Sequence, residues 1–209
     1  QTRPGYFALG EAGPVFVENR YTDFHRYWPH HTLRALWKLS RWLDPVGVRM
    51  EFLNNQRHAD LYAGDPLAPA QWSPAAIFAT VMLSSPLAWA ELQNLPESYF
   101  AQAAELIRTW REHRERLFAC SVHPIGCEPD GASWTGFAAD AGDGAGYLLV
   151  FRELSDRPEA SFDLPGRLVE AAKAEVLGGD GEVRLADGAA RVHIPEPLGY
   201  LFTRLAGAR

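Results

Sequence analysis

The sequence predicts a mixed fold, in which an α/β region over residues 1–118 is followed by an all-β region over residues 119–209. Two observations support this prediction. Up to residue 118, short strand-like runs alternate with helical patterns three times, as is typical of a parallel sheet covered by helices. After residue 118, short β-rich runs are separated by turn signals such as AGDGAG, GGDG and ADG, which suit hairpin turns and indicate a small antiparallel sandwich.

The first two strands and the helix between them show in the apolar pattern. The run PVFVE at 14–18 is strand-like, and VRMEFLN at 48–54 predicts a second strand. Between them, residues 30–43 place one face at helical spacing, formed by Leu33, Leu36, Trp37, Ser40 and Leu43.

The next two helices frame a third strand. Ser73 followed by Pro74 predicts a helix start, with serine as the cap and proline at the first helical position. That helix ends before PLAWAEL at 86–92, which predicts the third strand. A helix of about six turns is then predicted by apolar residues that recur every three or four positions: Tyr99, Phe100, Ala103, Leu106, Ile107, Trp110 and Leu117.

The all-β region is predicted from six runs: 133–140, 146–154, 160–164, 181–187, 190–195 and 199–205. The stretch LVEAAKAEVLGG at 168–179 is compatible with a short helix or with a strand, because its valine and leucine suit both. Three parallel strands in the first region would leave both sheet edges unpaired. We therefore expect an upstream barrel segment or a partner chain to complete the sheet, and a homo-oligomer is possible.

Composition limits the kind of function. The chain has 209 residues, 47% of them apolar, and its net charge of −6 without a long basic run argues against a nucleic-acid partner. No stretch is long and apolar enough for a membrane helix, and no signal-peptide pattern opens the sequence. Two cysteines suit a reducing compartment, so a cytoplasmic location is expected. No glycine-rich phosphate loop follows a strand, so no cofactor is expected.

Polar residues follow all three predicted strands of the first region. Because the carboxyl ends of parallel strands meet at one edge of the sheet, ligands bind there in α/β architectures. The residues in these positions are Glu18, Asn19, Arg20, Tyr21 and Asp23 after the first strand, Asn54, Asn55, Gln56, Arg57 and His58 after the second, and Trp89 and Glu91 at the third.

This mixture of side chains is suited to a sugar. Carboxylates, amides and arginine hydrogen-bond hydroxyl groups, and aromatic rings pack on the apolar faces of a sugar ring. Glycoside cleavage also requires a pair of carboxyl groups, and Glu18 and Asp23 qualify by type. Alternatively, either carboxylate caps the following helix or pairs with Arg20 or Arg26.

Four segments together resemble the last third of α-galactosidase-type (melibiase-like) glycoside hydrolases. They are ENRYTDFHRYWPHHTLRALWKLSRWLDP, RMEFLNN, WSPAAIFATVMLSSPLAWAELQNLPE and WREHRERLFACSVHPIGCEPDGASWTGF, in that order. The resemblance implies the last β/α units of a TIM-type barrel over 1–118 and a C-terminal antiparallel β-sandwich over 119–209. It also implies a carbohydrate substrate and a retaining mechanism.

In such enzymes an aspartate nucleophile lies on a mid-barrel strand, and the acid/base follows the sixth strand in a Ser-Asp-x-Thr-Asp loop. The matching loop here is ENRYTD, in which Thr22 and Asp23 fit the end, whereas Asn19 or Arg20 occupies the position of the catalytic aspartate. The resemblance therefore makes Glu18 the first candidate for acid/base and Asp23 the second. Arg20, Tyr21, Asn54, Asn55, Arg57, Trp89 and Glu91 are the expected substrate-binding residues. We expect the nucleophile to come from outside this chain.

Two other interpretations remain open from the sequence. The first alternative to an active hydrolase is a degenerate hydrolase or a non-catalytic carbohydrate-binding module. In the binding module, Trp134, Phe137 and Tyr147 would form an exposed platform, although their spacing suits core packing better. A metalloenzyme would use His25, His30, His31 and His58, or Cys120, His123 and Cys127, but neither set matches a common metal pattern. We therefore expect no metal.

Overall fold

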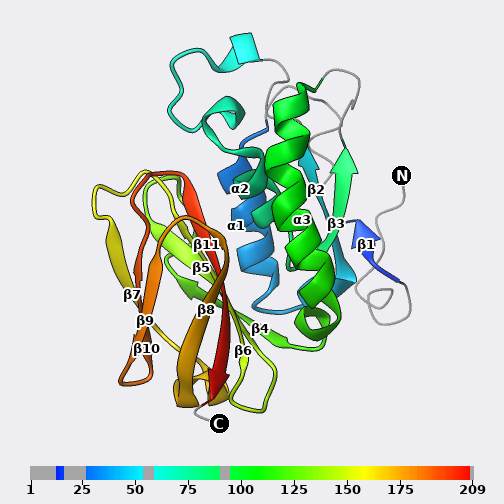
Figure 1. The fold of residues 1–209 in the computed structure, drawn as a ribbon. Helices are drawn as coiled ribbons and strands as arrows, with labels where there is room; N and C mark the ends of the chain where they lie inside the picture. The colour runs from blue at the N-terminus through cyan, green and yellow to red at the C-terminus, as the bar shows by residue number, and fades with distance from the viewer. Residues whose placement is uncertain (1–12, 17–26, 54–58, 90–94, 208–209) are drawn as a thin grey trace.

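A computed structural model of the chain describes residues 13–16, 27–53, 59–89 and 95–207 (Figure 1). Its first region contains the predicted alternation of strands and helices. The elements are β1 (Val15–Phe16), α1 (Pro29–Leu39), β2 (Val48–Leu53), α2 (Pro74–Ala79), β3 (Ser85–Trp89) and α3 (Glu97–Phe118), with short 3-10 turns at Pro45–Gly47, Ala59–Tyr62 and Pro69–Gln71. All three strands and all three helices of the first region are therefore confirmed within the described residues.

Local chemistry explains where α1 and α2 begin and end. In α1, Leu33 and Leu36 are fully buried, whereas the helix ends at Leu39, earlier than the predicted residue 43. The Ser73 hydroxyl caps α2 by accepting the N–H of Ala76 at 3.1 Å, as the Ser-Pro signal predicted. Helix α2 therefore starts on its expected signal.

The long helix α3 has one apolar face and one charged face. Its buried residues are Tyr99, Ala103, Leu106 and Leu117, which follow the predicted spacing. Phe100 was expected on the same face, but its side chain is 41% exposed. Ile107 lies within about 20° of Phe100 around the helix and packs against the core, so the exposure of Phe100 reflects its place in the first turn of α3 and not its angle around the helix.

The three strands of the first region form a parallel sheet in the order β1-β2-β3. Among the described residues this sheet is open, with β1 and β3 at its edges, and it does not by itself form a closed barrel. The helices pack on the face that carries Val48, Met50 and Phe52. The carboxyl ends of all three strands lie at one edge of the sheet (Figure 1).

The second region contains two antiparallel sheets. A five-stranded sheet has the order β4-β5-β6-β11-β8, and a three-stranded sheet has the order β7-β10-β9. The strands are β4 (Ser121–Gly126), β5 (Trp134–Asp140), β6 (Gly146–Arg152), β7 (Glu159–Asp163), β8 (Ala171–Gly179), β9 (Glu182–Ala186), β10 (Ala189–His193) and β11 (Gly199–Gly207), with a 3-10 turn at Gly166–Glu170. All six predicted runs are confirmed as strands.

The second region contains two further strands, β4 and β8, besides the six predicted ones. The ambiguous stretch at 168–179 forms β8, which pairs with β11 at the edge of its sheet. The segment SVHPIG was not predicted as a strand, yet it forms β4 at the opposite edge. An edge strand tolerates Pro124, because the missing N–H leaves no neighbour unsatisfied.

The turns follow the predicted chemistry, with one difference. The ADG turn joins β9 to β10, with Asp187 at φ 52° and Gly188 at φ 75°, a left-handed pair that suits a two-residue hairpin. The GGDG segment, however, connects β8 to β9, which belong to different sheets. It is therefore a crossover between layers and not the turn of a hairpin.

Two apolar cores hold the molecule together. One packs α1, α2 and α3 against Phe137, Tyr147, Phe151 and Phe202 of the five-stranded sheet. The other fills the space between the two antiparallel sheets. Packing therefore continues across residue 118, and the division at 118 into two domains stays a prediction about chain organisation.

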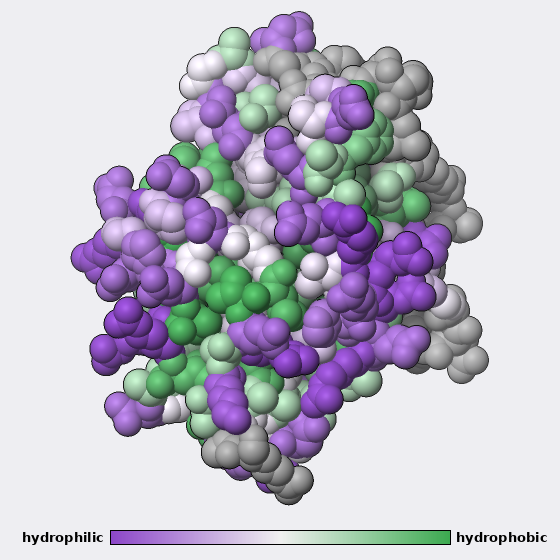
Figure 2. Space-filling model, viewed as in Figure 1, coloured by the Kyte–Doolittle hydropathy of each residue, from purple (hydrophilic) through white to green (hydrophobic). Residues whose placement is uncertain are grey.

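The face seen in Figure 2 is mostly hydrophilic, with hydrophobic residues gathered between α3 and the strands β8 and β11. Val176 of β8 is 42% exposed. Within the described ranges, no helix is both long and apolar enough to cross a membrane.

Candidate functional site

The site predicted from the sequence starts where the three parallel strands end. In the register of the sheet, Leu53 at the end of β2 lies beside Trp89 at the end of β3. β1 runs parallel to β2 and reaches Phe16, beside Arg49. The structure therefore brings the three strand ends that precede the predicted residues to one edge.

Most of the predicted side chains lie outside the described residues. These are Glu18, Arg20, Tyr21, Asp23, Asn54, Asn55, Arg57 and Glu91. Trp89 is described as the last residue of β3, but its side chain lies outside the described set. The roles of these nine residues therefore stay predictions, and the described residues around them define the site's surroundings.

Aromatic and acidic side chains join the segments that follow β1 and β2. The indole N–H of Trp28, just before α1, donates to Asp65 Oδ2 at 2.8 Å. The Tyr62 hydroxyl accepts the backbone N–H of Tyr27 at 2.8 Å, and the rings of Trp28 and Tyr62 meet edge to face with centroids 5.3 Å apart. The two loops above the sheet edge are thus tied to one another by polar and aromatic contacts.

His30 lies in the first turn of α1, beside this aromatic group. Its side chain is buried, and its ring centroid is 4.3 Å from that of His31. Burial, together with the nearby charges of His31 and Arg34, lowers the pKa of His30 to about 4. His30 is therefore neutral at pH 7. Among the described residues, no group of three histidine, cysteine or acidic side chains could hold a metal ion.

A hollow of about 350 Å³ lies between the N-terminal ends of α2 and α3. Its size is near the lower limit of small-molecule sites, which span about 300–1,000 Å³. Both helices follow strands of the parallel sheet, so the hollow is on the side of the strands' carboxyl ends. The lining residues are Ala70, Gln71, Trp72, Ser73, Pro74, Pro96, Ser98, Tyr99 and Gln102.

The lining of this hollow is polar and uncharged. Gln71 and Gln102 carry amides, and Ser98 carries a hydroxyl. Burial raises the pKa of Tyr99 to about 12, so its phenol keeps its proton. Amides and hydroxyls beside apolar proline and aromatic surface suit a neutral hydroxylated ligand better than an anion or a metal.

Glu51 is a buried carboxyl group that sequence reasoning missed. It lies on β2 and is fully buried. Its neighbours Met50 and Phe52 pack against the helices, so the alternation of a strand places Glu51 on the other face of the sheet. The available signal was a pair of charged residues, Arg49 and Glu51, two positions apart inside an otherwise apolar run.

The structure also tests the two other interpretations. Trp134, Phe137 and Tyr147 are buried, so the prediction of an exposed sugar-binding platform on these residues is wrong. They pack in the cores because they lie on β5 and β6, which are buried along their whole length. Both cysteines are free, with Cys120 buried and Cys127 exposed.

The fold defines a class of architecture: a parallel β/α unit packed on an antiparallel sandwich. No protein-family model matches the sequence, and no curated protein matches it. Solved structures do match.

The structure matches a double variant of the GH36 alpha-galactosidase AgaA from Geobacillus stearothermophilus in complex with raffinose, with a TM-score of 0.60 and 9% identity over 85% of this chain and 24% of that chain. It matches the galactosidase domain of the alpha-galactosidase-sucrose kinase AgaSK with a TM-score of 0.57 and 11% identity over the same shares. The GH36 alpha-galactosidase AgaB from Geobacillus stearothermophilus gives a TM-score of 0.55 and 11% identity, again over the same shares.

The chain spans about a quarter of the length of these structures. At this identity, the similarity shows the fold alone. It confirms at the level of fold the resemblance to α-galactosidase-type glycoside hydrolases that the sequence predicted.

Proposed function

We propose that this chain is the C-terminal part of a retaining glycoside hydrolase that acts on α-galactoside-like substrates. In this proposal, residues 1–118 are the end of a (β/α)8 barrel, and residues 119–209 are the sandwich that supports it. The observation that carries the proposal is the match of 85% of the chain to GH36 alpha-galactosidase structures. The parallel strand ends at a common edge support it independently.

The proposal gives the residues at the sheet edge specific roles. Glu18 protonates the leaving oxygen and then activates water, and Asp23 is the second candidate for this role. The sugar hydroxyls and ring are held by Arg20, Tyr21, Asn54, Asn55, Arg57, Trp89 and Glu91. The nearby cluster of Trp28, Tyr62 and Asp65 keeps the first two loops together.

Further strands would complete this site. The described parallel sheet has β1 and β3 as edge strands, and edge strands present unpaired backbone N–H and C=O groups that another strand can satisfy. We propose that a neighbouring barrel segment or partner chain pairs with these edges and supplies the carboxylate nucleophile. The free cysteines fit the reducing, cytoplasmic location that we also propose.

Hydrolysis of an aryl α-galactoside tests the proposal. This chain alone is expected to leave the substrate intact, whereas a polypeptide that joins it to the missing strands is expected to hydrolyse it with retention of configuration. Robust turnover by this chain alone would show that the nucleophile lies within it and would overturn the proposed division of the active site.

The acid/base assignment has its own test in the active polypeptide. Glu18→Gln is expected to lower kcat/KM by about 10²–10⁴-fold for a poor leaving group, and by much less for a nitrophenyl leaving group that needs no proton. Asp23→Asn serves as the matched comparison, since both variants replace a carboxylate by its amide. Equal losses for both leaving groups in Glu18→Gln would contradict its role as acid.

Non-catalytic carbohydrate binding is the second candidate function, and the uncharged hollow between α2 and α3 favours it. Gln102→Ala is expected to weaken retention of a glycan on this chain if the hollow binds sugar without cleavage. A chain that binds α-galactosides while its completed form never hydrolyses them would replace the hydrolase proposal by this one.

A further inference from the structure

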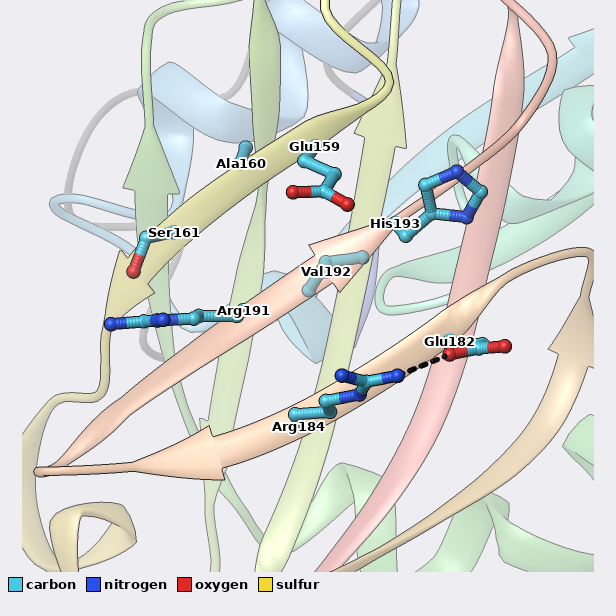
Figure 3. A pocket seen from close by; sticks show the side chains of 8 residues that line it. All are labelled: Glu159, Ala160, Ser161, Glu182, Arg184, Arg191, Val192 and His193. Carbon is cyan, nitrogen blue, oxygen red and sulfur yellow. Dashed lines mark hydrogen bonds and ion pairs between the residues drawn. The ribbon is translucent and has the colours of Figure 1, made fainter.

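The outer face of the three-stranded sheet carries a hollow that the proposed hydrolase function does not use. The hollow has a volume of about 660 Å³ (Figure 3), which is ample for a small molecule. Its lining residues come from β7, β9 and β10: Glu159, Ala160, Ser161, Glu182, Arg184, Arg191, Val192 and His193.

The register of the sheet arranges the polar side chains of this hollow in two rows. One row contains Ser161, Arg191 and Arg184, which are successive cross-strand partners. The other row contains Glu159, His193 and Glu182. Neighbouring strands are about 4.8 Å apart and alternate residues on one face about 6.8 Å apart, so the hollow presents a basic row beside an acidic one.

The two arginines of the basic row differ in their partners. Arg184 Nη2 lies 3.3 Å from Glu182 Oε2, as the dashed line in Figure 3 shows. Arg191 is exposed and makes no ion pair or side-chain hydrogen bond within the described part of the chain. In Figure 3 its guanidinium extends toward the strand of Ser161, away from Arg184. A guanidinium and a hydroxyl, both able to donate, thus lie on adjacent strands.

This arrangement has an energetic cost when the hollow contains only water. Arg184 and Arg191 are directly opposed on adjacent antiparallel strands. Like charges directly opposite one another destabilise a sheet. An anion beside Arg191 would offset this repulsion with a charge-assisted hydrogen bond.

We propose that the outer face of β7, β10 and β9 binds a small hydroxylated molecule with one oxyanionic group, a carboxylate or a phosphate. Arg191 and Ser161 donate hydrogen bonds to the oxyanion, and Arg184 adds positive charge. The acidic row accepts hydrogen bonds from the ligand's hydroxyl groups and repels a second anionic group. The site is independent of the proposed hydrolase function, because it lies on another sheet and uses none of the strand-end residues.

The test uses three ligands in NMR titrations of this chain: galacturonate, inorganic phosphate and galactose. Galacturonate and phosphate are expected to shift amide signals of β7, β9 and β10, with galacturonate binding more tightly because it also contacts the acidic row. Galactose, which lacks an oxyanion, is expected to leave these signals unchanged. Shifts of equal size with galactose, or none with either anion, would overturn the proposal.

Arg191→Gln is expected to lower the binding affinity for galacturonate and for phosphate about tenfold, consistent with the loss of a charged hydrogen bond. Arg108→Gln on the exposed face of α3 is the matched control, because it removes the same charge away from the hollow. Without ligand, Arg191→Gln should keep or slightly raise the Tm, since it relieves the repulsion from Arg184. Undiminished anion binding in Arg191→Gln would show that the hollow is not the site.

Discussion

The parallel and antiparallel regions of this molecule distribute their polar residues in different ways. In the parallel region, the strands are mostly apolar runs, and polar residues follow them in the sequence. In the three-stranded antiparallel sheet, Arg191 and His193 alternate with buried Ala190 and Val192, so the polar groups cover a face. The difference follows from burial, because a parallel sheet is covered on both faces and an antiparallel one can leave a face to water.

The two regions also contain buried ionisable groups that respond oppositely to pH. His30 in α1 loses its proton more readily than usual, whereas Glu153, which follows β6, keeps its proton more readily. Both respond to the same cause, since burial disfavours the charged form of either group. Four predictions use these contrasts, from the largest expected effect to the smallest.

The largest effect is expected from the core that joins the regions. Phe202 of β11 is fully buried in the core that includes the helices, and its ring stacks on Tyr147 with centroids 5.7 Å apart. Phe202→Ala is expected to lower the free energy of unfolding by about 3–5 kcal/mol. Hydrogen exchange is expected to speed up in both α3 and β11, because they share this core.

Leu148→Ala is the matched comparison, because Leu148 belongs only to the core between the two sheets. Leu148→Ala is expected to lower the free energy of unfolding by about 2–5 kcal/mol. Hydrogen exchange is expected to speed up in the antiparallel strands and not in α3. If exchange in α3 were unchanged by Phe202→Ala, the two regions would be independent folding units, and the shared core would be energetically unimportant.

The second prediction concerns Glu153, which is expected to make the stability of the protein decrease as the pH rises. Its fully buried carboxyl accepts the backbone N–H groups of Asp130 at 3.1 Å and Ser133 at 3.3 Å. Burial raises the pKa of Glu153 from 4.5 to about 7. Between these values the folded protein binds more protons than the unfolded chain, so the free energy of unfolding falls as the pH rises and levels off above pH 7.

Glu153→Gln keeps an uncharged acceptor and is expected to remove this contribution, which is on the order of 3 kcal/mol, so that stability in the variant rises with pH through the opposing contribution of His30. Urea unfolding at pH 4.5–7.5 measures it. Glu170→Gln, at an exposed carboxyl, is the control. An unchanged pH profile in Glu153→Gln would show that Glu153 ionises at its ordinary pH.

The third prediction concerns His30, which is expected to make the stability of the protein decrease as the pH falls. Its pKa falls from 6.5 to about 4 on folding, through burial and the charges of His31 and Arg34, with Asp65 and Asp130 opposing the shift. The unfolded chain therefore binds more protons between pH 4 and 6.5, and stability is lost as the pH falls through that window. The loss is on the order of 3 kcal/mol.

Because the contributions of His30 and Glu153 oppose each other in the wild type, His30→Gln is expected to leave the Glu153 contribution alone, so that the free energy of unfolding decreases as the pH rises from 4.5 to 7. Urea unfolding between pH 4 and 7 checks it, with His123→Gln on β4 as the control. A wild-type slope retained in His30→Gln would assign the acid sensitivity to another group.

The smallest of the four effects concerns a helix start in the parallel region. The Ser73 hydroxyl accepts the Ala76 N–H of α2 at 3.1 Å. Ser73→Ala is expected to cost about 1 kcal/mol, measured by urea unfolding, whereas Ser73→Asp should retain most of the stability by capping the same N–H. An equal loss in both variants would show that the hydroxyl contributes through the neighbouring hollow and not as a cap.

Elements with a strong local signal were predictable from the sequence. The Ser73–Pro74 start, the apolar face of α1 and the six β-rich runs depend on neighbours within a few residues. β4 was missed because Pro124 argues against a strand unless its edge position is known. β8 was ambiguous because its exposed residues show no alternation.

The candidate site also has features that the sequence predicted and features that it did not. The sequence pointed to the strand ends, and the parallel register brings those ends to one edge. The burial of Glu51, the hollow beside Gln102 and the opposition of Arg184 to Arg191 were not predictable. Each depends on which distant segments become neighbours.

The sequence by itself determined the alternation of three strands and helices, the change to β structure near residue 118 and the polar residues that follow the parallel strands. Only the tertiary structure decided the sheet order, the core shared across residue 118 and the charged rows on β7, β10 and β9. Periodicity and capping act over one or two turns of chain, whereas pairing and burial join residues far apart in sequence and depend on the packing of the whole molecule.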